Sequence, residues 1–347
     1  MLVFSDLHHG ELYESIRILF EGRMGAKLYR QVGESWYDNG YWRVYDHPNT
    51  VAQYLGLYAT VEYQKLQAEN PGVRDWKNRD STREGEGQYT ILDHEWGAVH
   101  NAVTLEAFKG MKFDIIVSSM PQHIEPFERL RREFQPHAKH IFQQGNNWPA
   151  DPRVVNMLNS TTVQPPAGAN HVRYHQEFDL TRWAPVKPPE TSSMCSMMHC
   201  LRGKGLTDWN SLCGHLPGWT LKNYGAGNPD GPVAYSDIAT AMGAFLYHNK
   251  EGGDGYGYNI HHASAMGRPI VCRLSYFKGM TAEPLLIPGK TCINLDDGNM
   301  SRAASQMNDW ARHGFEQRSA EIVKNFRSVV DFDKEFTHIK NFMNTLR

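Results

Sequence analysis

The sequence predicts an α/β protein built on parallel sheets, and three stretches support this prediction. Each begins with a short apolar run, continues through a polar or glycine-rich loop and passes into a segment with helical character: 1–20, 113–134 and 244–266. Strands that alternate with helices in this way form parallel sheets, and ligands bind beyond the carboxyl ends of such strands. The 347 residues are enough for two domains of ordinary size.

Composition narrows the class of protein. Hydrophobic residues make up 40% and charged residues 21% of the chain, and the formal net charge is −2. These values fit a soluble globular protein and do not favour a broad nucleic-acid-binding surface. No apolar run is long enough to span a bilayer, and the strand-like start at 1–4 indicates no signal peptide, so we expect a cytoplasmic protein.

The cysteine pattern does not favour a metal centre. The cysteines lack the paired spacing of metal ligands, so we expect buried free thiols in a reducing compartment. They are Cys195, Cys200, Cys213, Cys272 and Cys292. No Asp-x-Asp motif follows a predicted strand and no His/Cys ligand set stands out, so we expect that no divalent metal is needed.

The first domain is expected to open with a strand over 1–5, an amphipathic helix over 11–20 and a second strand over 26–32, a Rossmann-like opening. The loop after the first strand stands where parallel sheets bind ligands. It holds four candidate site residues, Asp6, His8, His9 and Gly10. The two histidines suit a functional role, but a capping or solvated pair would have the same pattern.

The rest of the first domain mixes clear strands with polar segments. Helices are expected over 51–68, 96–108 and 125–134, an exposed loop over 70–87, and strands over 113–119, 140–144 and 154–163. His123 stands between a strand and a helix, so it can supply an imidazole to a site or simply begin the helix. A proline-rich segment at 187–191 reads as a stiff linker to the second domain.

The second domain repeats the alternation. Strands are expected over 192–201, 218–225, 244–248, 270–274, 283–287 and 292–295, and helices over 207–216, 235–241, 300–310, 316–330 and 332–346. Arg202 and Lys204 follow the first of these strands and precede a helix. Two cations at such a position can neutralise a diphosphate, although a charged surface turn would have the same pattern.

The most informative stretch runs from Asp254 to Val271 and reads Asp-Gly-Tyr-Gly-Tyr-Asn-Ile-His-His-Ala-Ser-Ala-Met-Gly-Arg-Pro-Ile-Val. A glycine-rich loop follows a strand, and a run of small residues suited to a helix follows the loop. Glycine lets the backbone approach a ligand closely, and free N–H groups at a helix start bind phosphate. The order of these parts predicts a nucleotide site.

This stretch resembles the nucleotide-sugar signature of GT-B glycosyltransferases, especially the retaining family 4, also called glycosyl transferases group 1. The signature runs roughly Glu-Gly-Phe-Gly-x-x-x-x-Glu-Ala-x-Ala-x-Gly-x-Pro-Val-Val. The matching residues are Asp254, Gly255, Tyr256, Gly257, Ala263, Ala265, Gly267, Pro269 and Val271. Asp254 replaces the first glutamate, and His262 replaces the acidic residue that holds the donor ribose in that family. The segment 174–185 also resembles the family's Asp-x-x-x-Phe-x-Pro motif, through Asp179, Trp183 and Pro185.

The resemblance implies two Rossmann-like domains that face each other across a cleft. The acceptor domain would span 1–186, the nucleotide-sugar domain 187–315, and the helices over 316–347 would pack back on the first domain. Arg202 and Lys204 would clamp the donor diphosphate, His262 would meet the ribose, and Gly10 would lie against the donor. The sugar and phosphates would be lined by Asp254, Gly255, Tyr256, Gly257, Tyr258 and Asn259.

The acceptor side of the reaction is less defined. The usual catalytic histidine of the family has no counterpart near Gly145, so another group must assist the acceptor proton. The candidates are Asp6, His8, His9 and His123.

The expected activity is that of a hexosyltransferase-like enzyme that moves a sugar from a UDP- or GDP-linked donor to a hydroxyl group, with no separate cofactor. The acceptor is a glycan, a small metabolite, or a hydroxymethylated base of duplex DNA in a phage-infected bacterial cell. A DNA acceptor would need a basic groove, for which the sequence offers Arg74, Arg79, Arg129, Arg131 and Arg132, unless these form a solvated face. A sugar-nucleotide epimerase and a degenerate nucleotide-binding module are the alternatives of the same fold.

Overall fold

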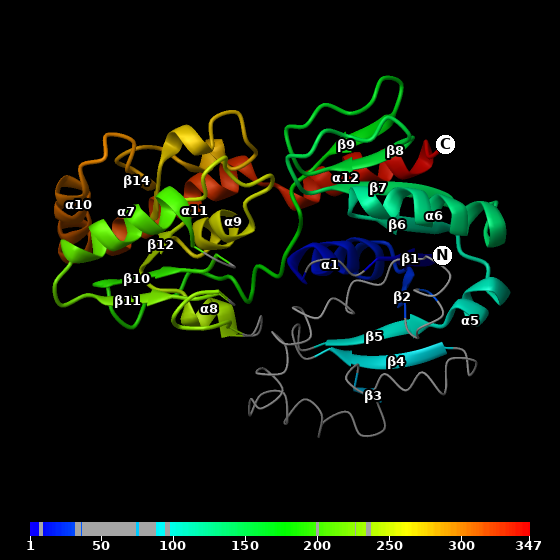
Figure 1. Ribbon diagram of the computed structural model, residues 1–347, viewed down its shortest axis with the longest axis horizontal. Coiled ribbons are helices and arrows are strands. Elements are labelled where there is room, and N and C mark those ends of the chain that lie inside the picture. The colour runs from blue at the N-terminus through cyan, green and yellow to red at the C-terminus, as the bar shows by residue number, and fades with distance from the viewer. Residues whose placement is uncertain are drawn as a thin grey trace. The chain divides into compact units, whose positions relative to one another are not determined.

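The computed structural model describes residues 1–6, 10–31, 36, 74–75, 88–93, 98–198, 201–225, 227–233 and 237–347. The predicted helix over 51–68 and most of the predicted loop over 70–87 lie outside these residues, as do His8 and His9. The chain forms two compact units, each with its own sheet (Figure 1). The first contains Met1–Phe178 and Phe332–Arg347, and the second contains Asp179–Val233 and Asp237–Asp331.

The sheet of the first unit has the strand order β3-β4-β5-β2-β1-β6-β7-β8-β9 in the described residues. All neighbouring pairs are parallel except β4 and β5. The strands are β1 (Leu2–Ser5), β2 (Lys27–Gln31), β3 (Arg74–Asp75), β4 (Gln88–Asp93), β5 (Ala98–Val103), β6 (Ile115–Ser118), β7 (Lys139–Gln144), β8 (Asn156–Asn159) and β9 (Asn170–Arg173).

Four helices and one π-helical turn pack on this sheet in the described part of the unit. They are α1 (Gly10–Arg17), the π-turn Ile18–Arg23, α5 (Leu105–Gly110), α6 (Pro121–Phe134) and α12 (Phe332–Asn344). An aromatic core fills the space under them, because Phe4 of β1 contacts the rings of Trp36, Phe108 and Phe127 at centroid distances of 4.7 to 5.7 Å. Such ring pairs add to the hydrophobic gain from burial.

The second unit holds an entirely parallel sheet with the order β11-β10-β12-β13-β14. Its strands are β10 (Ser193–Ser196), β11 (Thr220–Asn223), β12 (Phe245–Tyr247), β13 (Ile270–Cys272) and β14 (Cys292–Asn294). Its helices in the described residues are α7 (Gly203–Gly214), α8 (Ile238–Ala241), α9 (Tyr258–Ala265), α10 (Met300–Arg312) and α11 (Phe315–Val329). The described cysteines are free thiols, and three of them, Cys195, Cys272 and Cys292, are buried.

Glycine allows one close approach that shapes this unit. A Cβ atom on Gly205, in the first turn of α7, would lie 2.4 Å from the Asn249 carbonyl oxygen. The Tyr247 hydroxyl at the end of β12 donates a hydrogen bond of 2.6 Å to the Gly205 carbonyl. The start of α7 is therefore held directly against the carboxyl end of β12, where parallel sheets bind ligands.

Several sequence predictions were wrong in detail. The segment 96–108 is not one helix: Ala98–Val103 is β5, paired with β2 and β4, and the helix begins only at Leu105. The Thr104 hydroxyl accepts a hydrogen bond from the Ala107 N–H and fixes that start. The residues Glu283–Leu285 form a 3₁₀ turn rather than a strand. Strands β3, β4 and β9 were not predicted, and β3 lies within the segment 70–87 that was expected to be a loop.

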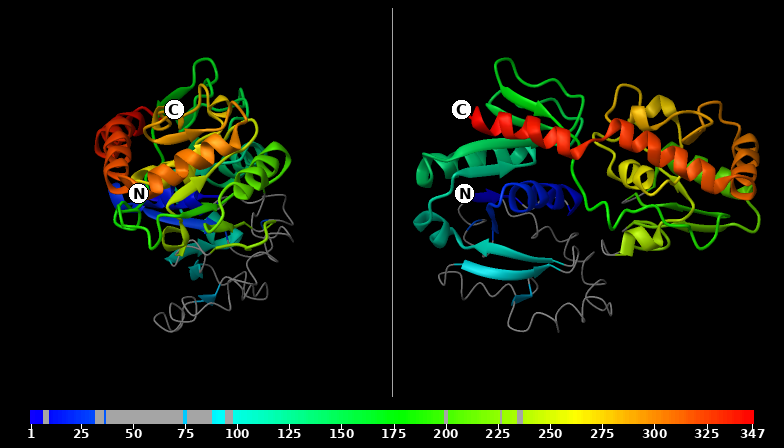
Figure 2. Two further views of the ribbon diagram at one scale, coloured as in Figure 1. Left: turned by 90° about the vertical axis from the view of Figure 1, so that its left-hand side faces the viewer. Right: turned by 180° about the vertical axis from the view of Figure 1, so that it is seen from behind.

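The C-terminal helices divide between the two units. The helix α11 belongs to the second unit and α12 to the first, and the second unit begins at Asp179, before the boundary at 186 that the sequence predicts. In Figure 2, α12 is the red helix beside β9. Ion pairs and hydrogen bonds join α12 to the first unit, including His175 Nδ1 to Glu335 Oε1 at 2.7 Å. No helix among the described residues has the length and apolar character needed to cross a membrane.

Candidate functional site

Two of the predicted acid–base candidates meet in the first unit. Asp6 follows β1 and is 3% exposed, and His123 lies in the first turn of α6 and is fully buried. The His123 Nδ1 atom lies 2.6 Å from Asp6 Oδ2. The Ser119 backbone N–H and hydroxyl also donate to the Asp6 carboxylate, at 2.7 and 2.8 Å.

This arrangement orients an imidazole whose Nε2 atom is buried in the structure. A carboxylate that accepts the Nδ1 proton fixes the imidazole tautomer and orientation, and leaves Nε2 as the atom able to take a proton. The pair sits at the carboxyl ends of the neighbouring parallel strands β1 and β6. Gly10 is the first residue of α1, in the segment that follows β1.

The two cations predicted to clamp a diphosphate stand at the start of α7. Arg202 occupies the N-cap position with extended backbone and has an exposed side chain. Lys204 is also exposed, and its Nζ lies 3.1 Å from Asp208 Oδ1. Since α7 begins beyond the carboxyl end of β10, the helix N-terminus and both cations share one edge of the sheet.

A third cation at this edge was not predicted. Arg273 directly follows β13, and its Nε and Nη2 atoms lie 2.6 and 3.1 Å from the Asp208 carboxylate. Burial acts to raise the pKa of Asp208, but the hydrogen bonds from Arg273 and Lys204 outweigh it and hold the pKa below its usual range. Arg273 falls inside the strand that the sequence predicts over 270–274, so its position at the end of β13 was missed.

The glycine-rich loop between β12 and α9 is held by an acidic residue. Asp254 Oδ1 lies 2.7 Å from Lys250 Nζ, and its Oδ2 lies 3.3 Å from His248 Nε2. Burial acts to raise the pKa of Asp254, but the hydrogen bond from His248 and the Lys250 charge hold it well below its usual range. Gly257 has φ 79° at the N-cap of α9, a left-handed conformation that favours glycine. Gly255 is buried within the same loop.

The predicted site residues on and before α9 form an aromatic stack. Tyr256 is buried and its ring stacks on that of His261, with centroids 4.1 Å apart. The ring of Tyr258 contacts the Tyr256 ring edge to face, with centroids 4.9 Å apart. His262 is 1% exposed and lies flat on Trp183, with ring centroids 3.8 Å apart. The Asn259 side chain donates to the Met197 carbonyl beyond β10, at 3.1 Å.

The arginines proposed for a DNA acceptor are partly paired. Arg131 contacts Glu128 at 3.0 Å, and Arg132 contacts Glu125 at 3.1 Å, both within α6. Arg79 lies outside the described residues, and the side chain of Arg74 does as well. Across the described part of the chain, no group of His, Cys, Asp and Glu side chains could hold a metal ion.

Solved structures resemble the chain over almost its whole length at low identity. Sucrose-phosphate synthase from Thermosynechococcus elongatus matches with a TM-score of 0.60 and 9% identity, covering 99% of this chain and 98% of that chain. HepE from Anabaena in complex with UDP-glucose matches with a TM-score of 0.58 and 12% identity, covering 99% of each chain.

An alpha-glucosyltransferase in complex with UDP and a 13-mer DNA matches with a TM-score of 0.56 and 10% identity, covering 99% of this chain and 98% of that chain. No family model and no curated protein matches the sequence. The chain therefore has the GT-B fold of two Rossmann-like α/β units that the stretch from Asp254 to Val271 predicts.

Proposed function

We propose that the protein is a glycosyltransferase that moves a sugar from a nucleoside-diphosphate sugar to a hydroxyl acceptor. The observation that carries this proposal is the carboxyl edge of the second sheet, where Arg202, the glycine-rich loop at Asp254 and Arg273 follow β10, β12 and β13. Parallel sheets bind ligands at this edge, and the residues there suit a sugar and a diphosphate.

The donor side needs a group that accepts the charge of the leaving diphosphate. As the bond between the anomeric carbon and the phosphate oxygen breaks, its electron pair stays on the diphosphate. Arg202 and the N–H groups at the start of α7 would stabilise that charge. Cationic side chains can do this without a divalent metal, so we propose a metal-independent reaction.

The acceptor side needs a group that removes a proton. We assign this role to the Asp6–His123 pair, in which the imidazole would take the proton of the acceptor hydroxyl as its oxygen bonds to the anomeric carbon. Asp6 would stabilise the imidazolium that forms. His8 and His9, which are close to Asp6 in the sequence, remain alternative candidates for removing the acceptor proton.

Two structural neighbours contain UDP or UDP-glucose, which supports a UDP-linked donor. Membership of the retaining family 4 is also part of the proposal, carried by the matches from Gly255 to Val271. One neighbour binds DNA, but pairing of Arg131 and Arg132 with glutamates speaks for a glycan or small metabolite as acceptor here.

A thermal-shift panel of UDP, UDP-glucose, GDP and GDP-mannose tests the donor. A ligand at 100 times its Kd that binds only the folded state should stabilise the protein by about 2.7 kcal/mol. Product analysis then separates the activities, because a transferase leaves an acceptor-linked sugar and an epimerase leaves an altered sugar without acceptor. If no nucleoside diphosphate raises the melting temperature, the proposal fails.

A further inference from the structure

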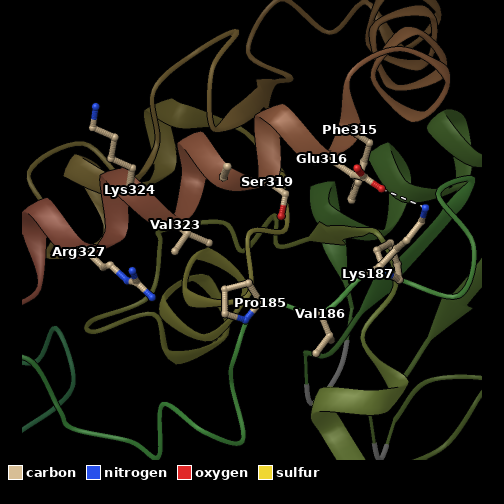
Figure 3. Close-up of a pocket in the computed structure, with 11 residues that line it drawn as sticks. Pro185, Val186, Lys187, Phe315, Glu316, Ser319, Val323, Lys324 and Arg327 are labelled. Atoms are coloured by element: carbon tan, nitrogen blue, oxygen red, sulfur yellow. Dashed lines mark ion pairs between the residues drawn. The ribbon is translucent and has the colours of Figure 1, made fainter.

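A groove on the second unit lies apart from the residues proposed to bind the donor. It is bounded on one side by α11 and on the other by the segment 185–188, and has a volume of about 550 Å³ (Figure 3). Ligand pockets in proteins commonly have volumes of this order. All of its lining residues belong to the second unit.

The walls of the groove are mainly apolar. Pro185 and Val186 belong to one wall, and Val323 points from α11 toward Pro185 (Figure 3). Val186 is 55% exposed, so this wall is open to a ligand.

The groove has one cationic end and one neutral end. Arg327 points from α11 toward the Pro185 side, and the described part of the chain offers its guanidinium no ion-pair partner (Figure 3). At the other end, Lys187 Nζ lies 3.0 Å from Glu316 Oε1, so these two charges compensate each other. The ammonium of Lys324 points away from the groove.

We propose that this groove binds a small amphipathic anion, with an alkyl or aryl body between α11 and the segment 185–188 and an acidic group at Arg327. The apolar walls favour the body through the hydrophobic effect, and the uncompensated guanidinium selects a negative head group. The ligand would be a single dissolved molecule and not a membrane surface, because the apolar residues line a groove.

Two contacts connect the groove with α9. Trp183, two residues before Pro185, stacks on His262 at 3.8 Å. At the end of α9, a Cβ atom on Gly267 would lie 2.1 Å from Ser319 Oγ on α11, so the two elements are in direct contact. A ligand that fixes the segment 185–188 and α11 therefore acts on the helix that carries Tyr258, Asn259 and His262. This coupling rests on the proposed function, and it makes the anion a regulator of donor binding.

Octyl phosphate, titrated calorimetrically below its micelle concentration, tests the site. We expect saturable binding, with binding at least tenfold weaker for Arg327→Glu and for Val323→Trp, which fills the groove. Lys324→Glu, with the same charge change on the same helix, should alter the affinity less than twofold, and melting temperatures verify that each variant folds. Equal losses in Arg327→Glu and Lys324→Glu, or no binding by the wild type, would overturn the site.

Three further ligands identify what is recognised. Octanol and inorganic phosphate should each bind at least tenfold more weakly than octyl phosphate, because each lacks one half of the ligand. Tighter binding to phosphatidylglycerol vesicles than to octyl phosphate would instead indicate a membrane surface and contradict the proposal.

Titration of UDP with and without saturating octyl phosphate tests the coupling. We expect the UDP affinity to change at least threefold in the wild type and not in Arg327→Glu. Unchanged UDP affinity in the wild type would overturn the regulatory role. Failure of the protein to bind either UDP or GDP would refute the proposed function instead, and octyl phosphate binding would still report on the groove.

Discussion

At the scale of single residues, the second unit gathers cations around one carboxylate. Asp208 is 2% exposed. Its carboxylate pairs with Lys204 and Arg273 and accepts a hydrogen bond from the Asn249 side chain. Two of the three cations at this edge therefore have part of their charge compensated. Arg202 makes no ion pair with any described residue and is the cation best placed to meet a phosphate.

Arg202→Ala should weaken UDP binding by about 10- to 100-fold, since a hydrogen bond to a charged group contributes about 1.5–3 kcal/mol. Uridine lacks the diphosphate, so its affinity should change less than twofold. Isothermal titration with both ligands measures the difference, and Lys290→Ala, at an exposed turn of the same unit, serves as the charge control. Equal losses of UDP and uridine affinity in Arg202→Ala would show that this residue does not contact the phosphates.

Arg268 presents the opposite case, a cation buried without compensation. Its side chain is 1% exposed, and its Nε and Nη1 atoms have no hydrogen-bond partner among the described residues. Burial lowers the pKa of Arg268 to about 10. The lowered pKa means that the unfolded chain binds this proton more tightly, so the charge destabilises the fold at every pH below about 10.

Arg268→Met should therefore raise the free energy of unfolding at neutral pH, by on the order of 1–3 kcal/mol. Urea denaturation of the wild type and the variant measures the change. Arg302→Met is a suitable comparison, because Arg302 is half exposed and paired with Asp297, and its replacement should have little effect. A clear loss of stability in Arg268→Met would mean that a bound group compensates the guanidinium.

At the scale of elements, the sequence located most helices and strands but not their partners. Apolar runs such as 113–119 mark buried central strands. Ala98–Val103 was mistaken for helix because its parallel partner β2 is distant in sequence and its hairpin partner β4 was not predicted. Strand β9 was missed because it is a polar strand at the sheet edge. In the site, motif positions could be predicted, whereas the Asp6–His123 pair joins residues 117 positions apart. Local patterns do not encode such long-range pairs.

Helix α6 is fixed to the sheet by a polar relay. Glu128 Oε1 lies 2.6 Å from His140 Nδ1 on β7, and the other His140 nitrogen lies 2.8 Å from the Ser118 hydroxyl on β6. Burial acts to raise the pKa of Glu128, but the hydrogen bonds and charges of His140 and Arg131 lower it to about 2. The ionised carboxylate is therefore more stable in the folded state than in the unfolded chain.

Glu128→Gln should reduce the free energy of unfolding at pH 7 by about 1–3 kcal/mol. The stabilisation by a depressed carboxyl pKa is complete above the unfolded value of 4.5 and is lost as the pH falls toward about 2. The difference in free energy of unfolding between wild type and variant should therefore become smaller from pH 5 to pH 2. Urea denaturation at several pH values measures this difference. Glu125→Gln, whose carboxylate is 55% exposed, should change little, and a difference independent of pH would disprove the ionic account.

At the scale of the whole molecule, each unit has its own sheet and core, and α12 returns to the first unit after α11 has completed the second. The contacts of α12 and of the residues after it are specific. Glu335 accepts a hydrogen bond from His175 and Asp333 pairs with Arg23, and beyond the helix the Arg347 N–H donates to the Asn156 side chain at 3.0 Å. The predicted donor residues other than Gly10, by contrast, belong to the second unit. We therefore expect two thermal transitions that respond to different changes.

Calorimetry of the full chain should resolve the two unfolding transitions. UDP at 100 times its Kd should stabilise the folded second unit by about 2.7 kcal/mol, and so raise the temperature of its transition, while the transition of the first unit stays nearly unchanged. Glu335→Gln removes the carboxylate charge beside His175. It should reduce the free energy of unfolding of the first unit by about 1–3 kcal/mol and lower the temperature of its transition. Glu316→Gln, on the exposed face of α11, is the matched control and should move neither transition by more than about 0.5 kcal/mol. A single transition that both UDP and Glu335→Gln shift would mean that the two cores unfold as one, because only coupled units pass on the effects of changes made in just one of them.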